Sequence, residues 1–151
     1  ETMPYLHGHT YSGHALAMAA AVATIEAYQQ DKLIDKAAKT GAYLMKKLKE
    51  LQDKHPCIGE VRGKGLFCGI EIVKNRQTKE PIHEALMEPP RPATSKMKFL
   101  GKCMEEGVYI MPGGASVITF SPPLAITTEE LDFGLDVIDR NLAICDADYQ
   151  K

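Results

Sequence analysis

The hydrophobic residues change their spacing at Pro56, and this change constrains the fold more than any other feature of the sequence. Between residues 32 and 54, the apolar side chains recur at helical spacing. Beyond Pro56, residues 58–62 and 66–73 are short runs rich in β-branched side chains, and a glycine-containing turn separates them. That pattern is typical of an antiparallel hairpin. A chain that changes period in this way must pack helices against a sheet.

The flanking segments extend the pattern in both directions. Residues 16–30 are rich in alanine and predict a helix, which Thr10 or Ser12 could cap and whose small side chains suit burial in a larger assembly. Residues 95–106 predict a further helix, and a capping box formed by Thr127 and Glu130 opens the last one.

A second hairpin is predicted from the strand-like runs 108–111 and 116–120, which flank a proline-glycine turn. Residues 74–94 contain four prolines and predict an irregular surface segment. The expected fold class is therefore α+β, with an antiparallel sheet of two hairpins and helices packed on one face. The sequence shows no internal repeat and no linker that would divide the chain.

Charge and composition exclude several functions. The chain has 18 Lys and Arg against 20 Asp and Glu, which gives a net charge of −2 and no basic field for nucleic acid or an anionic membrane. Its longest apolar run is far shorter than the ~20 residues that a membrane span requires. Four widely spaced cysteines predict reduced packing groups and a cytoplasmic location, with a disulfide as the less favoured reading (Cys57, Cys68, Cys103 and Cys145).

The densest polar cluster lies at residues 7–14, and three interpretations of it compete. His7, His9 and His14 could bind a metal, although no Cys, Asp or Glu stands near them to complete a shell. The glycines and hydroxyls could instead shape a turn and cap the next helix. The hydroxyls of Thr10 and Ser12, beside a helix N-terminus, could also bind a phosphate group.

Three motifs in order resemble one known family. HGHTYSGHALAMAAAVATIEAY, VRGKGLFCGIE and SPPLAIT are similar to the C-terminal part of class III aminotransferases, which are pyridoxal-phosphate enzymes of fold type I. The resemblance implies that Thr10 binds the cofactor phosphate of a neighbouring subunit and that His9 lies beside it, so the complete enzyme would be a homodimer. It also implies that residues 1–30 are the phosphate-motif segment and the helix that joins the large domain to the small one, and that residues 31–151 are the small C-terminal domain.

The same resemblance places the family's Schiff-base lysine upstream of residue 1. No lysine of this chain matches that position, so we expect no catalytic residue here and no activity from the chain alone. The chain is then expected to be a fragment, about the last third of a larger aminotransferase. A non-catalytic binding or oligomerisation module on the same fold is the alternative.

Substrate preference can be inferred at one aligned position. Relatives that bind an α-carboxylate carry arginine four residues before the second proline of SPPL, where this chain has Thr119. Threonine cannot form the bidentate ion pair that arginine forms with a carboxylate. The expected reaction moves an amino group from an ω-amino acid or primary amine, of the β-alanine or taurine type, to a keto acid such as pyruvate.

Residues of the VRGKGLFCGIE motif are expected to be structural. Arg62 should pair with carbonyl groups or a carboxylate, and Glu71 should lie on a solvated strand face. Phe67 and Cys68 are both expected in the core.

Overall fold

A computed structural model describes residues 6–82, 94–114 and 116–150. Its internal contacts divide the chain into two units, Glu1–Ile34 and Asp35–Lys151. The predicted division between residues 30 and 31 stays a prediction. Each unit is considered by itself below.

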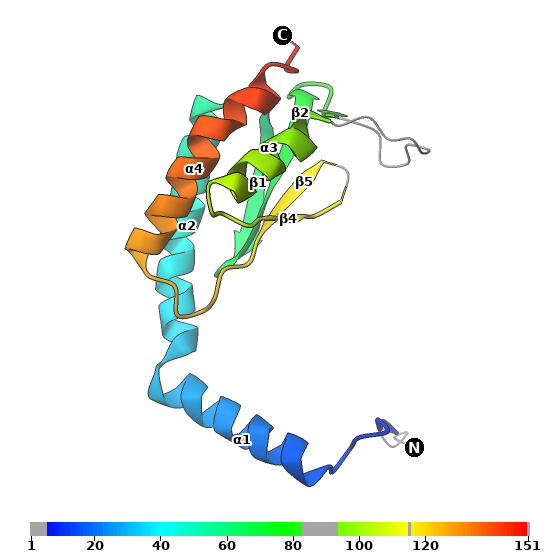
Figure 1. The fold of residues 1–151 in the computed structure, drawn as a ribbon, viewed down its shortest axis with the longest axis vertical. Coiled ribbons are helices and arrows are strands. Elements are labelled where there is room, and N and C mark those ends of the chain that lie inside the picture. The colour runs from blue at the N-terminus through cyan, green and yellow to red at the C-terminus, as the bar shows by residue number, and fades with distance from the viewer. Residues whose placement is uncertain (1–5, 83–93, 115, 151) are drawn as a thin grey trace, which may run out of the picture. The chain divides into compact units, whose positions relative to one another are not determined.

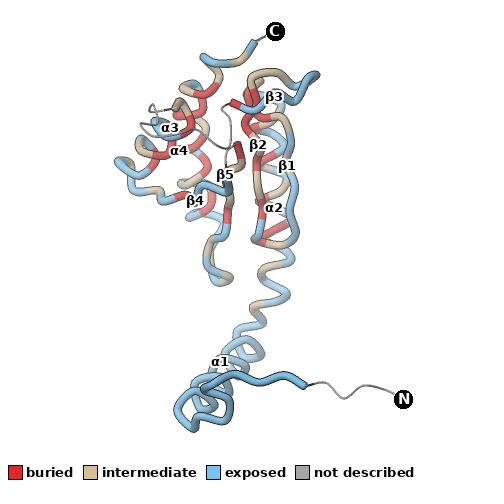
Figure 2. The backbone as a smooth tube through the Cα atoms, turned by 90° about the vertical axis from the view of Figure 1, so that its right-hand side faces the viewer, coloured by how far each residue is buried: buried red, intermediate tan, exposed pale blue. Residues whose placement is uncertain are grey.

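The first unit contains a polar segment and helix α1 (Ala15–Gln30), and it ends within the first turn of the next helix. Alanine and the other good helix formers of this segment account for the helix. No residue of α1 is buried, and the tube in Figure 2 is coloured as exposed along the whole helix. Large apolar side chains such as Leu16, Val22 and Ile25 are therefore exposed in this chain. The predicted burial of α1 in a larger assembly stays a prediction.

The second unit contains one antiparallel sheet, and both predicted hairpins are confirmed (Figure 1). The first hairpin pairs β1 with β2, the second pairs β4 with β5, and β2 pairs with β5 to join them. A short fifth strand, β3, pairs with β2. The strands are β1 (Ile58–Lys64), β2 (Phe67–Asn75), β3 (Glu80–Pro81), β4 (Met111–Pro112) and β5 (Val117–Phe120).

One face of this sheet forms the core. Cys68 lies opposite Phe120 and Ile70 lies opposite Ile118, and all four side chains are buried. Residues directly opposite each other in an antiparallel pair share a face, so these side chains point to the same side. The helices α2 (Leu33–Lys54), α3 (Ser95–Glu105) and α4 (Thr128–Asp146) contribute the other half of the same core. The α+β class and the packing of helices on one face are confirmed.

Two local expectations were wrong. Phe67 is exposed, because it precedes the buried Cys68 and adjacent strand residues point to opposite faces. Residues 74–94 are not irregular throughout, since β2 continues to Asn75 and a turn leads into β3. The side chain of Asn75 accepts hydrogen bonds from the backbone N–H groups of Gln77 and Thr78, and these bonds stabilise that turn. The rest of the predicted segment, residues 83–93, lies outside the described residues.

Helix α2 approaches the first hairpin at a pair of glycines. Gly41 is buried, and a Cβ atom added to it would overlap the backbone of Gly65. Gly65 itself has φ of 58°, in the left-handed region that favours glycine. The absence of a side chain at position 41 therefore lets the helix lie directly on the hairpin turn.

We predict that Gly41→Ala destabilises the domain by about 1–3 kcal/mol, because the added methyl group forces backbone away from backbone. Gly101→Ala in α3 is the matched control, since a Cβ there meets no atom within 4 Å. Alanine should stabilise that helix by about 0.5–1 kcal/mol. Denaturant unfolding of both variants checks this, and equal or greater stability of Gly41→Ala would contradict the close contact.

Candidate functional site: an exposed helix start and an apolar cavity

The polar segment before α1 folds into a tight turn. The backbone N–H of Ser12 donates to the carbonyl of His9 at 2.9 Å, and the N–H of His14 donates to the carbonyl of Tyr11 at 3.1 Å. The hydroxyl of Ser12 accepts from the N–H of His9 at 3.0 Å. Gly13 has φ of 78°, a conformation that suits glycine. These bonds fix the backbone just before the first turn of the helix.

His14 is the N-cap of α1, so the expectation of Thr10 or Ser12 as the cap was wrong. The Nδ1 atom of His14 accepts from the N–H of Ala17 at 3.5 Å. Gly13 delays the start of the helix, and the Ser12 hydroxyl is already bonded to the chain before it. A histidine cap is outside the usual set of Ser, Thr, Asp and Asn, and for that reason the sequence pattern missed it.

Thr10 is exposed, and its hydroxyl makes no hydrogen bond to any described residue. It stands one turn before a helix N-terminus, where unpaired N–H groups and the helix dipole favour an anion. His9 is also exposed, and its ring lies edge-to-face with that of His7, with 3.0 Å between their Nε2 atoms. The donors needed for a phosphate group are thus present and accessible. Among residues 6–82, 94–114 and 116–150, no group of three His, Cys, Asp or Glu side chains could hold a metal ion.

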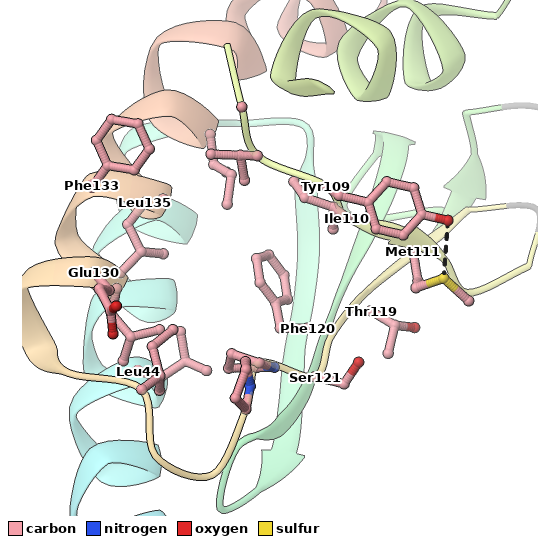
Figure 3. Close-up of a pocket in the computed structure, with 18 residues that line it drawn as sticks. Leu44, Tyr109, Ile110, Met111, Thr119, Phe120, Ser121, Glu130, Phe133 and Leu135 are labelled. Carbon is pink, nitrogen blue, oxygen red and sulfur yellow. Dashed lines mark hydrogen bonds between the residues drawn. The ribbon is translucent and has the colours of Figure 1, made fainter. Parts of the chain in front are cut away.

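The second unit has a cavity of about 500 Å³ at the start of α4 (Figure 3). Leu44 of α2 and Phe133 and Leu135 of α4 line one side, and Ile110 lines another. The SPPL motif runs along its edge, and Phe120 points into the space between these side chains. The cavity is mainly apolar, with a few polar groups at its margin, as is usual for small-molecule pockets.

Thr119 lies at the margin of this cavity, beside Ser121 and close to Met111 of the neighbouring strand (Figure 3). Because neighbouring residues alternate along β5, Thr119 faces away from the helices while Ile118 faces toward them. Gly113 packs closely against the Thr119 hydroxyl, since an added Cβ would overlap it. The position that carries arginine in some relatives is therefore on the sheet face that the helices leave uncovered.

Arg62 lies on this uncovered face and pairs with two carboxylates, as the sequence predicted. Its Nη1 atom is 3.1 Å from a carboxylate oxygen of Glu60 and 3.5 Å from one of Glu71. Arg62 stands opposite Gly69, which stands opposite Thr119. Arginine, glycine and threonine therefore form a row across three strands. Glu71 is half-buried rather than fully solvated.

The sequence pattern gave no sign of one buried cation. Lys96 is only 1% exposed, and its ammonium group donates to the carbonyl of Gly114 in the turn between β4 and β5. Burial lowers the pKa of Lys96 from its ordinary value. Its place at the start of an amphipathic helix is one where lysine is normally solvated, so only the tertiary structure reveals its burial.

The four cysteines are buried, as predicted. Burial raises the pKa of the Cys103 thiol to about 11 and that of Cys145 to about 12. The thiols therefore stay protonated at neutral pH, and a protonated thiol is a poor nucleophile. They serve as packing groups rather than as reactive centres.

Comparison with known proteins identifies the family. The model of the family described as aminotransferase class-III matches residues 1–142. The leucine/methionine racemase of Thermococcus litoralis is 35% identical over 93% of this chain, and the taurine–pyruvate aminotransferase of Bilophila wadsworthia is 39% identical over 87%. These matches cover 29% and 28% of the two relatives.

A solved structure agrees with these matches. Taurine:2-oxoglutarate aminotransferase from Bifidobacterium kashiwanohense, in complex with PLP and glutamate, has a TM-score of 0.79 and 33% identity. The match covers 93% of this chain and 30% of that one. The chain belongs to the class III aminotransferase family, and it spans less than a third of the length of these relatives. None of its described helices is long and apolar enough to cross a membrane.

Proposed function

We propose that the complete protein is a pyridoxal-phosphate-dependent aminotransferase that acts on an ω-amino acid or primary amine of the β-alanine or taurine type, with a keto acid such as pyruvate as acceptor. The family match along residues 1–142 carries this proposal. The named activity of the Bilophila wadsworthia relative supports the choice of substrates. We also propose that residues outside this chain supply the catalytic lysine.

In this proposal, Thr10 and His9 hold the cofactor phosphate. Pyridoxal phosphate, when bound, serves as the electron sink for the reaction. The Thr10 hydroxyl would donate to a phosphate oxygen, and the N-terminus of α1 would stabilise the negative charge. The exposure of both residues supports a contact with a neighbouring subunit, so we propose a homodimer whose site is complete only when two chains associate.

We predict that Thr10→Ala in the complete enzyme weakens retention of pyridoxal phosphate by roughly 10- to 100-fold, the value of one hydrogen bond to a charged group. Thr10→Ser keeps the hydroxyl and should restore most of the affinity. Thr24→Ala is the matched control, because the Thr24 hydroxyl donates to the carbonyl of Ala20 within α1. Cofactor titration by absorbance measures all three. Equal affinity for Thr10→Ala and Thr24→Ala would contradict the assignment.

Thr119 supports the proposed substrate class. Its side chain is short and neutral, and Gly113 packs against it on the uncovered sheet face. A substrate with an α-carboxylate would meet no guanidinium at this position. Arg62 stands in the same row of the sheet as Thr119, but it already forms ion pairs with Glu60 and Glu71.

We predict that Thr119→Arg raises kcat/KM for alanine as donor, which has an α-carboxylate, relative to taurine, which has none, by about 10-fold or more, because a bidentate charged pair contributes about 1.5–3 kcal/mol. Thr119→Gln is the control for side-chain length without charge, and it should leave the ratio near that of the native enzyme. If the two variants change the ratio equally, charge at this position does not set the choice of donor.

Because one relative is named as a racemase, the type of reaction also needs a test. An aminotransferase consumes the amine donor only when a keto acid is present, whereas a racemase inverts one amino acid without an acceptor. We expect the complete enzyme to form alanine from pyruvate with taurine or β-alanine as donor, and to form none without pyruvate. Inversion of an amino acid in the absence of any keto acid would contradict the proposed reaction.

A non-catalytic binding or oligomerisation module is the alternative function. The complete protein would then bind neither cofactor nor amine, so its titration with pyridoxal phosphate also separates these two functions. The proposal further includes a cytoplasmic location, which the buried free cysteines support because a reducing compartment preserves them.

A further inference from the structure

His55 is a buried histidine that lies between two carboxylates. It follows the last residue of α2, and its side chain is only 7% exposed. Its Nε2 atom is 2.6 Å from a carboxylate oxygen of Asp139, and its Nδ1 atom is 2.6 Å from one of Asp146. Both aspartates belong to α4, where they stand two turns apart. One imidazole ring therefore bridges the end of α2 to two points on the C-terminal half of α4.

The chemistry of this contact fixes the protonation of the ring. An ionised carboxylate only accepts hydrogen bonds, so each ring nitrogen must donate one. Both nitrogens of His55 can donate only when both carry a proton, which makes the ring an imidazolium cation. We propose that His55, Asp139 and Asp146 form a proton-dependent latch that holds the C-terminal half of α4 against the end of α2 and the start of β1.

The neighbouring charged groups support a cationic ring between anions. The ammonium group of Lys54 lies 2.5 Å from the second oxygen of Asp139. The backbone N–H of Cys57 donates to the second oxygen of Asp146 at 3.2 Å. The guanidinium of Arg76, from the turn after β2, donates to the backbone carbonyl of His55 at 2.7 Å rather than to either carboxylate. Among the described residues, the titratable and charged groups that face His55 are thus Lys54 of α2, Cys57, Arg76, Asp139 and Asp146.

The latch gives the domain a stability maximum between two limits of pH. Burial raises the pKa of Asp139, but the hydrogen bonds from His55 and Lys54 outweigh it and hold the pKa below its ordinary value. Stability from this carboxylate is therefore present above its unfolded pKa and is lost as pH falls through the folded one. On the alkaline side, loss of one ring proton leaves a carboxylate facing a nitrogen lone pair. Stability from the bridge is therefore lost on the alkaline side, once the ring gives up its second proton.

The first test needs no variant. NMR of the ¹⁵N-labelled chain at pH 6 should show two protonated ring nitrogens for His55, with N–H protons protected from exchange with solvent. The exposed ring of His14 provides the internal reference for a solvent-accessible imidazole. A folded domain in which one nitrogen of His55 carries no proton at pH 6 would overturn the latch.

The second test compares thermal unfolding at pH 6 and pH 9. His55→Gln removes the titrating ring, so the native chain should lose at least roughly 3 °C more of its Tm across this interval than the variant does. Asp146→Asn should likewise reduce the dependence on pH, whereas Asp136→Asn, an exposed aspartate of the same helix, should keep the native dependence. Equal pH dependence in the native chain and His55→Gln would contradict the proposal.

Discussion

Burial of one face of a twisted antiparallel sheet is the constraint on which the rest of the second unit depends. Cys68, Ile70, Ile118 and Phe120 must share that face because the register of β2 and β5 sets them opposite one another. The same alternation places every second side chain on the other face. Helices α2, α3 and α4 bury the first face, and no described helix of the unit covers the second. The chemistry of the uncovered face therefore follows from the packing of the covered one.

Unlike the apolar core, the uncovered face of the sheet carries charged and polar side chains. It presents the ion pairs of Arg62 with Glu60 and Glu71, the space above Gly69, and the Thr119 hydroxyl. Exposed ion pairs of this kind contribute little to the free energy of folding, about 0–1 kcal/mol. Their arrangement therefore bears more on which groups this face can bind than on the stability of the domain. The latch around His55 lies where α4 meets the end of α2, and it adds directional charged bonds to the apolar contact of those two helices.

Much of the second unit could be predicted from the sequence because its elements have local signals. The capping box of Thr127 and Glu130 is present, with the Glu130 carboxylate accepting from the Thr127 N–H at 2.9 Å. Both hairpins follow from short apolar runs and glycine turns. The hydrophobicity of Phe67 favours the core, but strand alternation places it on the other face. The prolines after Asn75 favour irregular structure, but β2 continues to that residue.

The site was harder to predict, for a physical reason. The roles of His14 as a helix cap and of Lys96 as a buried donor depend on backbone geometry and tertiary contact, which residue type alone does not encode. The bridge from His55 to α4 joins residues 84 and 91 positions apart, beyond any local pattern. Thr10 and His9 were singled out by a resemblance, and the structure adds that both are exposed before a helix start.

A crystal structure of the complete enzyme with pyridoxal phosphate would test the proposed phosphate contact of Thr10 most directly. The cofactor phosphate should lie within hydrogen-bonding distance of the Thr10 hydroxyl of the neighbouring subunit, at the N-terminus of α1. A phosphate bound elsewhere, with Thr10 in solvent or buried against unrelated protein surface, would contradict it.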